Sequence, residues 1–224
     1  MADKVARHLV AAGRTIDDDP REALAHALAA RRLASGIAPV REAAGLAAYH
    51  AGEWQTAIAE LRAYHRMTGR QTHLAVVADC ERALGRPERA IDLYRHANLN
   101  AMSPAEAAEL LIVAAGARRD LGQVAAAVAM LQVPELTGPR TPWQARLRYA
   151  YADALLAAGR REEAREWFAR AVDVDEEVET DAAERLLELD GVVIEDEDED
   201  DQAAEPDDAT TPEQPGAAAG PRSR

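Results

Sequence analysis

The feature that most constrains this chain is a repeated pattern of a glycine, an alanine and a large apolar residue. Four glycines are spaced 33, 37 and 37 residues apart, and each precedes an alanine by five residues and a large apolar side chain by nine. The four sets are Gly52, Ala57 and Leu61; Gly85, Ala90 and Tyr94; Gly122, Ala127 and Leu131; and Gly159, Ala164 and Phe168. A period in this range indicates stacked supersecondary units. Such stacks present an extended concave surface for binding other molecules.

The residues between these glycines predict helices in pairs. Asp19 before Pro20 and Ser103 before Pro104 are typical helix starts, because their side chains accept hydrogen bonds from free backbone N–H groups and proline costs no hydrogen bond in the first turn. The predicted helices are 3–13 with 20–34, 40–51 with 53–67, 71–84 with 86–98, 104–121 with 123–132, 142–158 with 160–174, and a single amphipathic helix at 177–189. We therefore expect an all-α fold of about five hairpins, with the last helix covering the end of the stack.

The hairpin units resemble the tetratricopeptide repeat. The segment YADALLAAGRREEAREWFARAVDVD matches the family pattern best, through Ala152, Gly159, Ala164, Phe168 and Ala171, and GRPERAIDLYRHA and GEWQTAIAELRAY follow. The unit around Gly122 is a weaker match, and the N-terminal pair lacks the turn glycine. The resemblance implies a right-handed α–α superhelix, in which small residues bring paired helices together and the large residues fill the space against the next unit.

Charge divides the chain into two parts. From Glu195 to Arg224 there are eleven acidic and two basic residues, a net charge of −9 out of −14 for the whole chain. This segment begins with seven consecutive acids, 195–201, and continues with Ala, Pro, Asp, Thr and Gly, a composition that buries too little apolar surface to fold. We therefore predict a repeat domain at 1–190 and a disordered acidic tail at 191–224.

Several classes of function lack their sequence signals. Cys80 is the only cysteine, and the six histidines are scattered singly, although His50 and His65 lie on paired helices. The sequence contains none of the usual catalytic, phosphate-binding or metal-binding motifs, so we expect no enzyme activity, no cofactor and no metal. The absence of a basic cluster argues against direct nucleic-acid binding. No apolar run is long enough to span a membrane and no secretory signal is evident, so we expect a cytoplasmic protein; its Arg, Ala and Gly bias suggests a bacterial genome.

The resemblance implies where a partner binds, because the first helix of each tetratricopeptide unit lines the concave surface. The residues expected there to bind a peptide or protein are Tyr49, His50, Arg82, Ile112, Arg119, Arg146, Tyr149 and Asp153. Arginines on such a surface suit a carboxylate-bearing peptide, since the guanidinium fork matches a carboxylate. The alternative is that these arginines pair with Asp79, Asp120 and Asp153 of the chain itself.

The sequence therefore predicts a non-enzymatic scaffold or adaptor that binds a protein or peptide on the concave repeat surface. One alternative is a regulatory module whose acidic tail shields a basic nucleic-acid-binding partner. Another is an accessory subunit of an enzyme complex, for which the apolar step Val192–Ile194 is a candidate docking segment. Self-association through the ends of the stack also remains open.

Overall fold

The expected hairpins form in the structure, a computed structural model that describes residues 1–138 and 140–192. The described part of the chain is all-helical, so the predicted fold class is confirmed. Its elements are α1 (Ala2–Thr15), α2 (Pro20–Ala34), α3 (Ala38–His50), α4 (Trp54–Thr68), α5 (Leu74–Ala83), α6 (Pro87–His96), the 3₁₀ helix η1 (Leu99–Ala101), α7 (Pro104–Asp120), α8 (Val124–Leu131), the 3₁₀ helix η2 (Pro134–Thr137), α9 (Gln144–Ala157), α10 (Arg161–Val172) and α11 (Ala182–Leu189).

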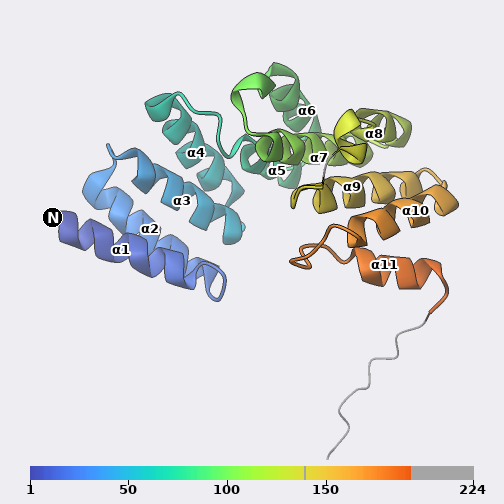
Figure 1. Ribbon diagram of the computed structural model, residues 1–224. Coiled ribbons are helices and arrows are strands. Elements are labelled where there is room, and N and C mark those ends of the chain that lie inside the picture. The colour runs from blue at the N-terminus through green and yellow to red at the C-terminus, as the bar shows by residue number, and fades with distance from the viewer. Residues whose placement is uncertain (139, 193–224) are drawn as a thin grey trace, which may run out of the picture. The chain divides into compact units, whose positions relative to one another are not determined.

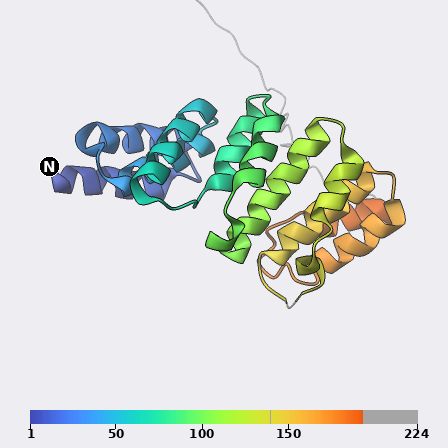
Figure 2. The ribbon, with the colours of Figure 1, turned by 90° about the horizontal axis from the view of Figure 1, so that it is seen from above.

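The helices pack in chain order, as Figure 1 shows. Each odd-numbered helix from α1 to α9 forms a hairpin with the helix that follows it, and each hairpin packs on the next. The first helices of the C-terminal hairpins also pack on one another, α5 on α7 and α7 on α9. In the view of Figure 2 these neighbouring helices lie side by side. The last helix, α11, packs on α10.

The four repeat glycines make the turns that the sequence predicts. Their φ angles are 74° at Gly52, 70° at Gly85, 71° at Gly122 and 77° at Gly159. This left-handed conformation is unfavourable for residues with a Cβ atom. In each turn the N–H of the residue after the glycine donates to the carbonyl five residues earlier, as Arg160 does to Leu155 at 3.0 Å, which is the Schellman closure of a helix.

The predicted helix starts are also confirmed. Asp19 accepts a hydrogen bond from the backbone N–H of Glu22 at 3.0 Å. Ser103 and Glu106 form a reciprocal capping box, in which the Ser103 hydroxyl accepts from the N–H of Glu106 at 3.3 Å and the Glu106 carboxylate accepts from the N–H of Ser103 at 2.9 Å. Local hydrogen bonding thus explains why α2 and α7 begin at these residues.

The alanines of the repeat lie in the hydrophobic core. Ala57, Ala90, Ala127 and Ala164 are all fully buried. Of the large residues that follow, Leu61, Leu131 and Phe168 are buried as expected. Tyr94 of α6 is half-buried and packs against the hydrophobic clusters on either side of it. The repeat pattern is therefore a packing pattern, and it leaves the outward faces of the first helices free to carry other side chains.

Two predicted helices begin three or more residues later than expected. The helix predicted at 177–189 begins at Ala182, because the Asp175 carboxylate accepts hydrogen bonds from the N–H groups of Glu179 and Thr180 at 2.8 and 2.9 Å and holds a loop instead. The helix predicted at 71–84 begins at Leu74, after His73 with a φ of 64°. The disorder predicted for the tail, and most of the Val192–Ile194 step, concern residues from 193 onward, which lie outside the described residues.

Candidate protein-interaction groove

A groove runs along the first helices of three successive hairpins and has a volume of about 360 Å³. One wall is the loop between α10 and α11, and the floor consists of small and apolar residues of α7 and α9. Its lining is Arg82, Ile112, Ala115, Gly116, Arg119, Leu131, Arg146, Tyr149, Ala150, Asp153, Glu179, Thr180 and Asp181. Residues 37 to 38 positions apart in sequence meet here because each hairpin places its first helix beside that of the next.

The groove gathers six of the eight residues that we expected on the binding surface: Arg82, Ile112, Arg119, Arg146, Tyr149 and Asp153. Tyr49 and His50 are not among the lining residues. Tyr49 lies on α3 and donates a hydrogen bond from its hydroxyl to Asp79 of α5 at 2.9 Å, while the exposed His50 packs its ring edge against Tyr49. That these residues bind a partner remains a prediction.

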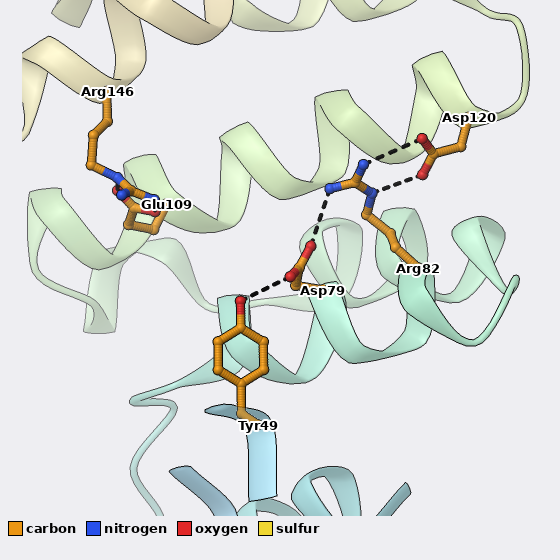
Figure 3. Close-up of polar contacts among 6 residues, drawn as sticks. All are labelled: Tyr49, Asp79, Arg82, Glu109, Asp120 and Arg146. Carbon is orange, nitrogen blue, oxygen red and sulfur yellow. Dashed lines mark hydrogen bonds and ion pairs between the residues drawn. The ribbon is translucent and has the colours of Figure 1, made fainter. Parts of the chain in front are cut away.

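Arg82 lies at the centre of a polar network at one end of the groove (Figure 3). Its Nε and one Nη donate to both carboxylate oxygens of Asp120 at 2.8 and 3.2 Å, and the other Nη donates to Asp79 at 3.1 Å. Burial disfavours the charge of Arg82, but the hydrogen bonds and charges of Asp120 and Asp79 outweigh it and raise the pKa of the guanidinium. Burial and the charge of Asp79 also raise the pKa of Tyr49 to about 12, so its hydroxyl remains a donor.

Gly116 makes room for this network. A Cβ atom built on Gly116 would lie 2.8 Å from Cζ of Arg82, closer than side-chain atoms approach one another. The guanidinium of Arg82 therefore lies directly against the backbone of α7. Any larger residue at position 116 would displace the guanidinium from this position. Sequence reasoning missed this glycine, because it lies inside a helix and belongs to no turn.

The other two groove arginines join α7 to α9. Arg146 donates to both carboxylate oxygens of Glu109 at 2.6 and 2.9 Å, and this hydrogen bonding raises the pKa of the arginine. Arg119 donates to Asp153. The arginines are thus engaged with acids of the same chain, as the alternative interpretation expected, although the partner of Arg146 is Glu109 and none of the three aspartates. An incoming carboxylate must share or exchange these partners.

The wall formed by the α10–α11 loop was also missed. Glu179 and Asp181 fall within the helix expected at 177–189, which was expected to cover the end of the stack, yet both line the groove. The pKa of the Tyr149 phenol is raised, first because the side chain is partly buried and second because it is hydrogen-bonded to Asp181. The three arginines of the lining are balanced by three carboxylates, those of Asp153, Glu179 and Asp181, so the groove has no excess of positive charge.

Cys80 and His65 are not among the residues that line the groove. Cys80 is fully buried, and burial followed by the charges of Asp79 and Glu81 raises the pKa of its thiol to about 12, consistent with a packing role. His65 donates to the carbonyl of Thr72 at 2.5 Å rather than meeting His50. Over residues 1–138 and 140–192, no group of three or more His, Cys, Asp or Glu side chains is arranged to hold a metal ion.

The stacked hairpins, together with a groove along their first helices, define a helical-repeat protein. Residues 72–175, which contain α5 to α10, match the family model described as tetratrico peptide repeat. Over this segment the chain matches the tetratricopeptide repeat family, as the sequence resemblance predicted. A comparison with curated proteins found no match.

The matched family has a characteristic class of function. Tetratricopeptide repeats generally mediate protein–protein interactions, and members of the family typically act as scaffolds without catalytic activity. The groove lies within the matched segment except for Glu179, Thr180 and Asp181, which follow it. None of the helices in the described part of the chain is long and apolar enough to cross a membrane.

Proposed function

We propose that this chain is a scaffold or adaptor that binds an extended segment of a partner protein in the groove between α5, α7 and α9. The observation that supports this proposal most directly is the convergence of Arg82, Arg119, Arg146 and Tyr149 from three successive first helices on one cavity of about 360 Å³. Apolar pockets with a few convergent polar groups are the usual form of a binding site. Repeat proteins place such sites along their stacked first helices.

The lining residues of the groove indicate what kind of partner segment would fit. The floor of Ile112, Ala115 and Ala150 suits a small apolar side chain. Arg146 is about half exposed and uses two of its three guanidinium nitrogens for Glu109, which leaves the third to donate to a carbonyl or carboxylate of the partner. Because the lining charges balance, we propose an amphipathic segment with few charges rather than a strongly acidic one.

The test is an affinity capture from a lysate of the source organism, analysed by mass spectrometry, with the full chain and two sets of substitutions as bait. One set changes Arg82, Arg119 and Arg146 to alanine. The matched control changes Arg95, Arg160 and Arg165 to alanine, which removes three ion-paired arginines outside the groove. The proposal expects a partner that is retained by the control and lost with the groove set. A partner retained by both would place binding elsewhere on the chain.

A fourth bait, Ala150→Phe, separates occlusion of the groove from loss of its charges. Ala150 lines the groove on α9 and takes part in none of the ion pairs described above. A phenylalanine there would fill part of the cavity while leaving the arginines and their carboxylates in place. Loss of the same partner with Ala150→Phe supports binding inside the groove, and circular dichroism of each variant verifies that the helices persist.

For the remainder of the chain, we propose that 1–190 is the repeat domain and that the acidic tail, 191–224, keeps the protein soluble in the cytoplasm of a bacterial cell. The tail carries nine of the fourteen net negative charges, which favours repulsion between copies. A chain ending at Gly191 tests this role. Lower solubility with an unchanged set of partners supports it, whereas loss of a basic partner would favour the alternative in which the tail shields that partner.

A further inference from the structure

The N-terminal hairpin brings together two histidines that the sequence leaves far apart. His8 on α1 and His26 on α2 are 18 residues apart, yet their Nδ1 atoms lie 3.0 Å from one another. Their rings are tilted by 43° with centroids 5.2 Å apart. The approach is possible because the buried alanines Ala12, Ala23 and Ala27 pack the two helices closely at this level.

The contact specifies how hydrogens are distributed over the two rings. Two imidazole nitrogens approach to 3.0 Å only if one carries a hydrogen and the other offers its lone pair. Glu22, one turn before His26 on α2, has a carboxylate oxygen 3.6 Å from the Nε2 of His26. This negative charge favours a hydrogen on that Nε2. We therefore assign the lone pair to Nδ1 of His26 and the donated hydrogen to Nδ1 of His8.

We propose that His8 and His26 form a two-histidine site for a divalent transition-metal ion, with Zn²⁺ as the reference ion. Zn–N bonds of about 2.0–2.1 Å at a tetrahedral angle place two ligand nitrogens roughly 3.3 Å apart. The observed separation of 3.0 Å is a few tenths of an ångström shorter, and small rotations of the side chains supply the difference. A carboxylate near the other nitrogen of a histidine ligand is the usual support of such sites, and Glu22 occupies that place.

Binding exchanges the shared hydrogen for the ion. The N–H bond at Nδ1 of His8 breaks and its proton leaves to solvent, while Nε2 of His8 takes a proton from solvent, so the ring stays neutral. Two Nδ1–metal bonds form, and no net proton is released. No third His, Cys, Asp or Glu completes a ligand set among the residues that the structure describes, so water fills the remaining positions. Such a site is exchangeable, prefers Cu²⁺, Ni²⁺ and Zn²⁺ over Mg²⁺ and Ca²⁺, and fastens α1 to α2 when occupied.

The test is a calorimetric titration of the full chain with ZnCl₂ near neutral pH, after removal of bound metal with a chelator. We expect one ion per chain. Binding should weaken at least about tenfold in His8→Gln and in His26→Gln, and about tenfold in Glu22→Gln, the lower end of the usual effect of a supporting group. The matched control is His96→Gln, which removes an exposed histidine whose ring contacts the carbonyl of Asp92 in its own helix.

A further variant separates specific binding from background binding. The acidic segment 195–201 is present in every variant, so the double variant His8→Gln/His26→Gln reports its contribution. The proposal is overturned if wild type binds no more Zn²⁺ than the double variant, or if His96→Gln weakens binding as much as His8→Gln does.

Discussion

Replacing Gly116 by alanine changes two terms of opposite sign, and the structure says how large each is. Alanine inside a helix is more favourable than glycine by roughly 0.5–1 kcal/mol. The new Cβ would lie 2.8 Å from Cζ of Arg82, so the guanidinium must leave its place on α7 and its hydrogen bonds to Asp79 and Asp120. Partly exposed ion pairs contribute about 0.2–1 kcal/mol each. We therefore expect the free energy of unfolding to change little, because the two terms nearly cancel.

The cancellation is revealed in a background without the guanidinium. In Arg82→Ala the clash is gone, so adding Gly116→Ala should stabilise the protein by the full helix-propensity term, roughly 0.5–1 kcal/mol. Urea unfolding of wild type, both single variants and the double variant yields the coupling free energy between the two positions, which we expect to be about 1 kcal/mol. If Gly116→Ala stabilises wild type and Arg82→Ala equally, the coupling is zero and the guanidinium does not rest on Gly116.

Three further expectations concern the fold. Phe168→Ala should lower the free energy of unfolding by about 3–5 kcal/mol, because the ring is fully buried; a loss below about 1 kcal/mol in urea unfolding would contradict this packing. Ser103→Ala should cost about 1 kcal/mol at neutral pH. Hydrogen bonds from Ser103 lower the pKa of Glu106 from 4.5. The stabilisation from this capping box is therefore present above pH 4.5 and is lost as the pH falls through the lowered pKa. Between neutral pH and about pH 3, Ser103→Ala should lose less stability than wild type, which urea unfolding at the two pH values would show. Cys80, with its pKa raised to about 12, should react with a thiol reagent only when urea unfolds the chain; rapid labelling of the native protein would show that the thiol is accessible.

The fold was predictable because its signals are local. A glycine at a left-handed turn, an alanine five residues later and a capping serine or aspartate each act over a few residues, so Gly159, Ala164 and Ser103 carry their structural meaning wherever they occur in such a chain. The two late helix starts show the limit of this reasoning. The start of α11 depends on Asp175 accepting hydrogen bonds from Glu179 and Thr180, a side-chain choice that competes with helix formation.

The candidate groove was predictable as a set of positions but not as a site. The tetratricopeptide resemblance implied that Arg82, Arg119 and Arg146 of the first helices face the binding surface, and the structure gathers them around one cavity. Their partners depend on how neighbouring hairpins are rotated against one another, which is why Arg146 pairs with Glu109, 37 residues away, rather than with an aspartate.

The sequence by itself therefore determined the helices, their turns and the order in which the hairpins stack, because a period of glycine and alanine is imposed by backbone conformation and close packing within each unit. Only the tertiary structure decided that the groove arginines are already paired, that an acidic loop forms one wall, and that His8 meets His26. These features join residues of different hairpins or opposite helices, and their geometry exists only once the helices have packed.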